Sequence, residues 1–264
     1  MKRLLTAVIA LPLLIALIVK GSQPLFAAFI LVVAVIGLAE FYRMALPGRK
    51  TEAVVASVLG APLALVPLLS NPLLLPVLTA LVLIAALALL FRFSDIRQAA
   101  QEWALLAAGL LYVPLLLSQL LLLKAEPFGE CWILLMMLIV MSGDSAAYYV
   151  GSALGRNKLY PAVSPNKSIE GALGGLAGSV AGAFVAKLTF FPQLGVVDCI
   201  ATALVLGVLG QLGDLFESLL KRSCGVKDSG TIVPGHGGIL DRLDSILFAA
   251  PAAWWYAHFI FTRG

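Results

Sequence analysis

The sequence predicts an all-α, polytopic membrane protein with about nine transmembrane helices and a cytoplasmic N-terminus. The first observation is composition: 61% of the 264 residues are hydrophobic and 12% are charged, whereas a soluble domain is roughly half apolar and about a quarter charged. The second is that the apolar residues form long runs without strand-like alternation. Because open sheets cannot sit in lipid, these runs indicate helices. A soluble globule, a disordered chain and a collagen-like fibre are excluded.

Nine apolar runs are the candidate helices. They cover residues 4–19, 24–39, 53–69, 72–91, 103–123, 131–150, 171–191, 196–220 and 246–261. Several are shorter than the roughly 20 residues that a span needs, so we expect their boundaries to shift by a few residues. The first run follows Lys2 and Arg3, as a signal peptide would, but no clear small-residue cleavage site follows it. We therefore expect a retained helix.

The basic residues support this count and set the orientation. With nine helices and the N-terminus inside, 14 of the 18 Lys and Arg residues fall on the cytoplasmic face. The four on the other face are Lys20, Lys124, Lys187 and Arg263. Such a bias is the positive-inside pattern. It also explains the net charge of +4, so we expect a bilayer partner and no nucleic acid.

The chain divides unevenly in polarity. Residues 1–130 are expected to form about five scaffold helices, whereas residues 131–264 form about four helices and carry the polar motifs. A glycine-rich stretch at 171–182 favours close helix packing. A phosphate loop is the alternative, but no P-loop lysine and hydroxyl residue follow it. The three cysteines match no metal or redox spacing.

Two carboxylates, Asp144 and Asp214, lie close to or within apolar runs. An acidic side chain at the bilayer centre costs about 2.5–3.5 kcal/mol on insertion scales, so such residues usually face a bundle interior or a watery cavity and have a functional role. The alternative is a residue at a helix end that reaches the interface.

Acidic residues also recur at helical spacing. Asp214, Glu217 and Ser218 share one helical face, and Asp241 and Asp244 repeat the i, i+3 spacing. Clustered carboxylates repel one another, and a hard cation such as Mg²⁺ relieves that repulsion through oxygen ligands. The alternative for each pair is a solvated helix end or a salt bridge.

A glycine-rich stretch and several basic residues lie close to these carboxylates in the sequence. Residues 235–238 read Gly-His-Gly-Gly, just before a predicted helix start near Asp241. Such a backbone can turn its N–H groups toward an anion, and a helix N-terminus adds positive potential. His236 is a candidate base, phosphate donor or structural residue. The neighbouring bases are Lys221, which can pair with Glu217 at i−4, and Arg222, Lys227 and Arg242.

Residues 218–244 read SLLKRSCGVKDSGTIVPGHGGILDRLD. This segment resembles, throughout its length, the signature of the phosphatidate cytidylyltransferase family, also called CDP-diacylglycerol synthases. The Ser-Pro-x-Lys-Ser-x-Glu-Gly pattern at 164–171 and the Asp144–Ser145 segment also look like that family. The resemblance is sharp from about residue 142 to 245, and before that it rests on hydropathy and length.

The resemblance implies an enzyme that makes CDP-diacylglycerol and pyrophosphate from CTP and phosphatidic acid. The lipid phosphate is itself the nucleophile and is largely ionised at neutral pH, since phosphate monoesters have a second pKa near 6. We therefore expect direct attack on the α-phosphorus, assisted by Mg²⁺, with a second, monovalent cation left open. The enzyme is expected in the plasma (inner) membrane with its site at the cytoplasmic face, and a homodimer is left open.

The resemblance also assigns roles to residues. The expected metal ligands are Asp144, Asp214, Asp241 and Asp244, and the last three count as catalytic together with Lys227. The expected substrate contacts are Ser164, Lys167, Ser168, Ser218, Lys221, Arg222, Gly235, His236, Gly237, Gly238 and Arg242. Two other classes stay open, a CTP-dependent lipid kinase and, further off, a secondary transporter, which would place its polar groups near the midplane.

Overall fold

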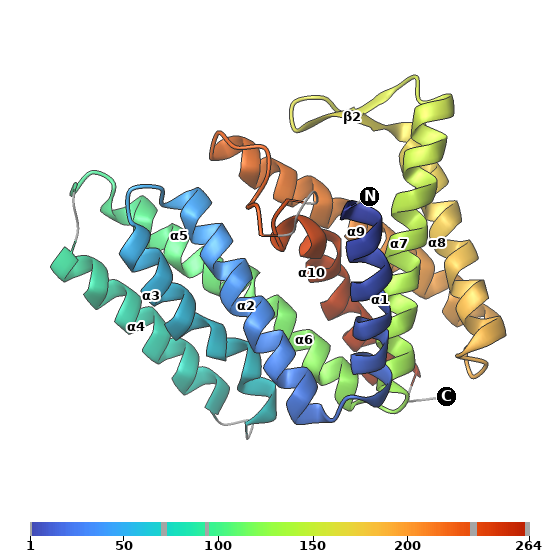
Figure 1. Cartoon of the computed structure of the whole chain (residues 1–264), viewed down its shortest axis with the longest axis horizontal. Coiled ribbons are helices and arrows are strands. Elements are labelled where there is room, and N and C mark those ends of the chain that lie inside the picture. Colours follow the sequence, from blue (N-terminus) through green and yellow to red (C-terminus); the bar gives the residue numbers. More distant parts are fainter. Residues whose placement is uncertain (1, 70–72, 93–94, 233–236, 262–264) are drawn as a thin grey trace.

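The computed structural model describes residues 2–69, 73–92, 95–232 and 237–261, and these are almost entirely helical (Figure 1). The first part contains α1 (Lys2–Lys20), α2 (Gln23–Ala45), α3 (Lys50–Gly60), the 3₁₀ helix η1 (Ala61–Leu68), α4 (Leu74–Arg92), α5 (Ala99–Tyr112) and α6 (Pro114–Ala125). The second contains α7 (Gly129–Leu154), β1 (Lys158–Tyr160), β2 (Ser164–Ser168), α8 (Ile169–Thr189), α9 (Val196–Ser223), α10 (Leu240–Trp255) and the π-helical turn η3 (Tyr256–Ile260).

Each predicted apolar run coincides with helical structure, which confirms the all-α class. Six helical segments of the described chain are long and apolar enough to cross a membrane: Gln23–Ala45, Lys50–Leu68, Ala99–Ala125, Gly129–Leu154, Ile169–Thr189 and Val196–Ser223. Two shorter apolar helices are Ala10–Lys20 and Leu75–Phe91. The count of nine spans and the side on which the N-terminus lies stay predictions. Proline explains one interruption, because Pro114 cannot donate the backbone bond that would join α5 to α6.

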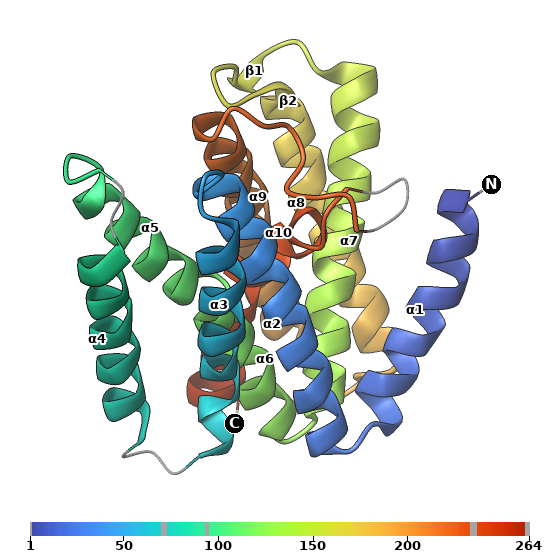
Figure 2. The ribbon, with the colours of Figure 1, turned by 60° about the vertical axis from the view of Figure 1, so that its left-hand side comes forward.

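The helices form two groups. In Figures 1 and 2, α7, α8, α9 and α10 pack together with α1 along α7, whereas α2, α3, α5 and α6 form the other group and α4 lies outermost. The predicted role of the glycine-rich stretch in α8 is confirmed. A Cβ added at Gly174 would lie 2.6 Å from Val150 Cβ of α7. The absence of side chains thus allows α7 and α8 to approach closely.

A short β-hairpin lies between α7 and α8 and forms the one sheet of the described residues. Strands β1 and β2 pair antiparallel, with Lys158 opposite Ser168 and Tyr160 opposite Ser164. Ser164, Lys167 and Ser168 of this polar segment were expected at the site, but no strand was predicted there. It lies outside the apolar runs, and its extended backbone finds hydrogen-bond partners in the opposite strand rather than within a helix.

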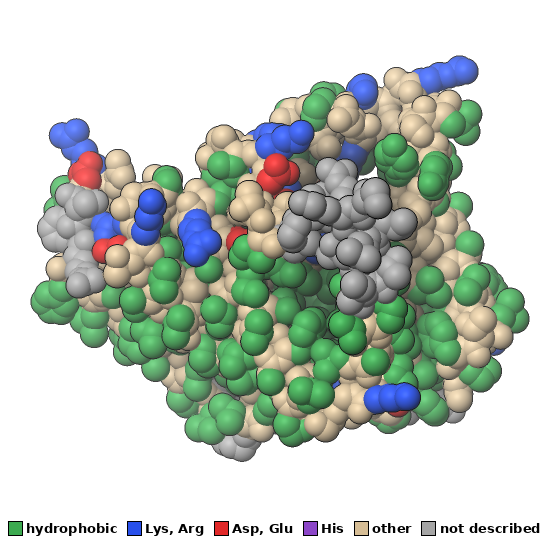
Figure 3. Space-filling view, viewed as in Figure 1, with side chains coloured by type: hydrophobic (Ala, Val, Ile, Leu, Met, Phe, Trp, Pro, Cys, Tyr) green, Lys and Arg blue, Asp and Glu red, His purple; other side chains and the backbone are tan. Residues whose placement is uncertain are grey.

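Charged side chains gather at the two ends of the helices, and more of the basic ones lie at one end than at the other. At one end Lys124 Nζ donates to Ile18 O, Lys187 Nζ donates to Leu194 O, and Gln23 Nε2 donates to Leu121 O. The hairpin and the C-terminus of α9 lie at the opposite end (Figure 1). Figure 3 shows most of the visible Lys and Arg side chains along that upper edge, above a body covered by apolar side chains. This distribution agrees with the asymmetry that the sequence predicts.

Cysteine labelling tests the orientation. Partly buried Cys131 begins α7, and partly buried Cys224 follows α9 at the opposite end. In inside-out vesicles, we expect a membrane-impermeant maleimide to label a variant that retains only Cys224 and to spare one that retains only Cys131. Right-side-out vesicles should reverse the result. Labelling of both variants from the same side would contradict the topology.

Candidate functional site

A cavity of about 560 Å³ lies where α7, the hairpin, α8, α9 and α10 meet. The lining residues are Asp144, Ala147, Tyr148, Gly151, Ser152, Leu159, Asn166, Lys167, Ser168, Gly171, Ala172, Gln211, Asp214, Asp241, Arg242, Asp244 and Ser245. All of them fall in the part of the chain where the polar motifs concentrate. The fold therefore brings sequence-distant motifs to one place.

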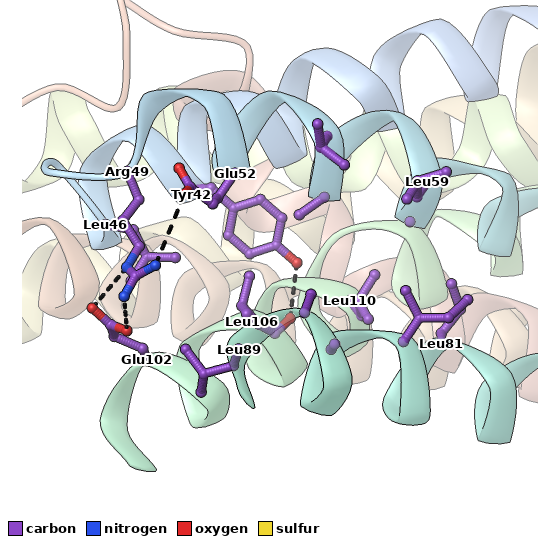
Figure 4. Close-up of a pocket in the computed structure, with 16 residues that line it drawn as sticks. Tyr42, Leu46, Arg49, Glu52, Leu59, Leu81, Leu89, Glu102, Leu106 and Leu110 are labelled. Carbon is purple, nitrogen blue, oxygen red and sulfur yellow. Dashed lines mark hydrogen bonds and ion pairs between the residues drawn. The ribbon is translucent and has the colours of Figure 1, made fainter. Parts of the chain in front are cut away.

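A second cavity, of about 130 Å³, lies among α2, α3, α4 and α5 and is mainly apolar (Figure 4). At one end Arg49 pairs with Glu102, with Nη2 and Oε2 2.7 Å apart, and Tyr42 donates its hydroxyl to Leu106 O at 2.8 Å. None of the residues predicted for the site lines this cavity. The polar cavity is therefore the candidate site.

Four carboxylates line the polar cavity, and three of them act on one another. Asp144 comes from α7, Asp214 from α9 and Asp244 from α10, and their negative charges repel across the space between the helices. One cation offsets this repulsion directly, because Lys167 Nζ of β2 lies 2.7 Å from Asp214 Oδ2. Asp144 and Asp214 therefore face a cavity, as predicted for carboxylates within apolar runs.

Asp241, the fourth carboxylate, is held by several donors. Lys221 Nζ lies 2.6 Å from Oδ1, and the N–H groups of Gly238 and Ser229 donate to Oδ2 at 2.7 and 3.1 Å. Burial alone would raise the pKa of Asp241, but these hydrogen bonds and the Lys221 charge outweigh burial and hold the pKa below its ordinary value. Asp241 thus stays ionised and binds the chain around it.

The shared helical face predicted for α9 is occupied by two contacts, and one of them is the salt bridge given above as the alternative to a metal site. Lys221 Nζ lies 2.6 Å from Glu217 Oε2, so the same ammonium bridges Glu217 and Asp241. Ser218 Oγ donates to Asp214 Oδ1 at 3.4 Å. Glu217 is 1% exposed, so its charge depends on that lysine. These contacts fix the side of α9 that faces α10.

The predicted substrate contacts are only partly brought together. Lys167, Ser168 and Arg242 line the cavity, and Ser168 Oγ also accepts the Gly171 N–H at 3.1 Å as the N-cap of α8. Ser164 pairs with Tyr160 in the hairpin. The predicted residues that do not line the cavity are Ser164, Ser218, Lys221, Arg222, Lys227, Gly237 and Gly238. Gly235 and His236 lie outside the described residues.

Some polar residues of the site were missed by the sequence analysis. Tyr148, Asn166 and Gln211 line the cavity, and Gln211 Nε2 donates to Ala172 O at 3.1 Å. Glu40 of α2 was missed as well, although its Oε2 accepts the backbone N–H of Leu240 at the start of α10, at 3.0 Å. A lone carboxylate beside an apolar run was the available signal, the same one that marked Asp144.

The carboxylates fit a hard divalent cation by their chemistry, since Mg²⁺ prefers oxygen ligands. Among the described lining residues, four aspartates face two cations, Lys167 and Arg242. The excess of negative charge leaves room for further positive charge. No three of the described His, Cys, Asp and Glu residues are grouped closely enough to hold an ion as they stand. The carboxylates therefore have the ligand chemistry that Mg²⁺ prefers, but the described residues do not have the spacing that would hold it.

Comparisons with known proteins agree with the resemblance in the signature. A family model described as "Cytidylyltransferase family" matches residues 1–260. A phosphatidate cytidylyltransferase of Bacillus subtilis is 46% identical over 126 residues, 48% of this chain and 47% of that protein. One of Brucella suis is 48% identical over 146 residues, 54% and 53% of the two chains. The matched segments thus span about half of these two relatives. One of Staphylococcus aureus is 36% identical over 94% of this chain and 95% of its own length.

Proposed function

Because the chain belongs to the cytidylyltransferase family, we propose that it transfers the cytidylyl group of CTP to phosphatidic acid and yields CDP-diacylglycerol and pyrophosphate. The single observation that carries the proposal is the polar cavity. It gathers Asp144, Lys167, Asp214, Asp241 and Asp244 from four separate elements, α7, β2, α9 and α10, around one space among the apolar helices. Relatives that bear the name phosphatidate cytidylyltransferase support the same activity.

The reaction needs no nucleophile from the protein. An oxygen of the lipid phosphate attacks the α-phosphorus of CTP, a new P–O bond forms, and the bond to the pyrophosphate breaks. Among the described lining residues there is neither a cysteine nor a histidine, and Ser168 Oγ is engaged as a helix cap. The task of the site is to hold two anionic substrates in line, which positioned charges achieve.

Lys167 and Arg242 are the described cations of the cavity, and we assign them to substrate phosphates. Asp144, Asp214 and Asp244 face one another across the same space and would hold Mg²⁺. Asp241 already accepts several hydrogen bonds. It would be a fourth ligand of the same Mg²⁺, through lone pairs that these bonds leave unused. When bound, Mg²⁺ would neutralise phosphate charge and stabilise the leaving pyrophosphate.

The position of the cavity suits both substrates. It extends from the hairpin and the first turns of α10 to Asp144 of α7 and Gln211 of α9, which lie in the middle part of their helices. A lipid can enter sideways from the bilayer while its phosphate reaches the charged end, and CTP can arrive from water. We place this end in the cytoplasm and the protein in the plasma membrane, from the excess of basic residues.

Product analysis tests the activity. Purified protein in mixed micelles with CTP, phosphatidic acid and Mg²⁺ should release pyrophosphate and form a cytidine-containing lipid in equal amounts. Release of CDP with a newly phosphorylated lipid would instead identify a CTP-dependent lipid kinase. The absence of turnover, with uptake of a polar solute into proteoliposomes, would favour a transporter.

Asp214→Asn should lower pyrophosphate release by about a hundredfold, because the charge that pairs with Lys167 and faces the other carboxylates is lost at constant size. Asp198→Asn is the matched control. Asp198 lies in the same helix at its other end, where it accepts from Gly195 N and Tyr256 Oη, each at 2.7 Å. Normal turnover by a folded Asp214→Asn protein would remove this residue from the site.

Removal of divalent ions should stop the reaction reversibly. We expect that exhaustive chelation abolishes pyrophosphate release and that added Mg²⁺ restores it, because the excess carboxylates of the cavity repel anionic substrates without a cation. Elemental analysis of the chelated protein is the control. Full activity of a protein shown to be free of divalent metal would refute the role of Mg²⁺.

A further inference from the structure

Glu40 connects the first half of the chain to the signature segment. It lies near the C-terminus of α2 and is 1% exposed. Its Oε2 accepts two hydrogen bonds, one from Ser229 Oγ at 3.2 Å and one from the backbone N–H of Leu240 at 3.0 Å. Both donors are about 200 residues away along the chain. A buried carboxylate of the predicted scaffold therefore contacts Ser229, in the segment between α9 and α10, and Leu240, the first residue of α10.

Glu40 of α2 caps the N-terminus of α10 through its contact with the Leu240 N–H group. Leu240 is the first residue of α10, and its preceding residue, Ile239, provides no side-chain cap. The first N–H groups of a helix have no partner within the helix, and a negative charge there is stabilised by the helix dipole. Glu40 supplies both the acceptor and the charge. The first turns of α10, which carry Asp241 and Asp244, are thus anchored to α2.

The Ser229 contact reaches Asp241 directly. Ser229 Oγ, which donates to Glu40, accepts the Asp241 N–H at 3.3 Å, and Ser229 N donates to Asp241 Oδ2 at 3.1 Å. Glu40, Ser229 and Asp241 therefore form one hydrogen-bond network. Because buried polar networks hold their members in place when every donor is used, displacement of Glu40 will move Asp241 as well.

Two glycines of the signature pass against the same carboxylate. A Cβ added at Gly230 would lie 2.8 Å from Glu40 Cδ, and one added at Gly238 would lie 2.7 Å from it. A side chain at either position would force the Glu40 carboxylate to shift, so glycine is what lets the backbone approach it this closely. The close approach to Glu40 explains why residue 238 is a glycine, which its place in the sequence alone does not. Its N–H group also donates to Asp241.

We propose that Glu40 is a positioning residue for the reaction, which caps α10 and holds the Ser229–Asp241 pair in the geometry that the cavity requires. The proposal rests on the proposed function. Glu40 does not line the cavity, so it acts through Asp241 and the start of α10. Among the described residues, Glu40 forms no ion pair within 4.0 Å, and its Oε1 is buried without a hydrogen-bond partner. Its charge is therefore directed at the N-terminus of α10.

The test compares Glu40→Gln and Glu40→Ala with Glu102→Gln. Glu102 is a matched control because it is also a buried glutamate of the first half, but it pairs with Arg49 beside the apolar cavity (Figure 4). Two readouts are measured: kcat and KM for CTP, and hydrogen exchange by mass spectrometry in the peptide that contains Ser229, Leu240 and Asp241. The second readout needs no turnover, so it tests the anchor even if the proposed activity is absent.

For Glu40→Ala we expect kcat to fall about tenfold or more, the effect of one or two lost buried hydrogen bonds, with a smaller change in KM. Exchange should accelerate at Leu240 and Asp241. Glu40→Gln should lie in between, since its carbonyl oxygen can still accept one bond. Ser229→Ala combined with Glu40→Ala should lose little more than either change alone. Equal effects of Glu102→Gln on both readouts, or unchanged exchange in Glu40→Ala, would overturn the proposal.

Discussion

The constraint on which the site depends is that a carboxylate buried among apolar helices must find donors. Glu217 meets it locally, through Lys221 one turn away. Asp241 and Glu40 meet it through the segment between α9 and α10, whose backbone and Ser229 supply the N–H and O–H groups. The segment between α9 and α10 is held in place because its movement away from Asp241 and Glu40 would leave these carboxylates buried without donors, which is costly.

The sequence predicted what depends on short separation. Hydropathy located the helical segments of the described chain. The i, i+4 rule gave the pair Glu217–Lys221 and placed Ser218 on the same face as Asp214, to which it donates. It failed where partners are distant. Glu40 closes an apolar run, where a carboxylate is usually a solvated helix end, and only folding shows that α10 begins beside it. The hairpin was missed because hydropathy carries no signal for a polar pair of strands.

Glycine shows the same limit in another form. In α8 the glycines recur at helical spacing, so their packing against α7 follows from periodicity and is confirmed. In the signature segment they stand in an irregular backbone, where periodicity says nothing. There the sequence favoured an anion cradle at 235–238, whereas the described structure places Gly238 between Glu40 and Asp241, with its N–H donated to the latter. The role of a glycine that does not recur at a regular spacing can be read only from its neighbours in the folded structure.

The two cavities differ in how their charged groups are paired. In the apolar cavity Arg49 lies 2.7 Å from Glu102 and 4.0 Å from Glu52, so both glutamates have the same cationic partner, and the Glu102 pair joins α5 to the start of α3. In the polar cavity the carboxylates outnumber the described cations, and three of them repel one another. A fold gains nothing in stability from such repulsion, so the unbalanced charge supports the proposal that a ligand completes the site. Glu40 and Glu217 have donors of their own away from the cavity lining, whereas the unbalanced carboxylates face the space where phosphates and a cation would meet.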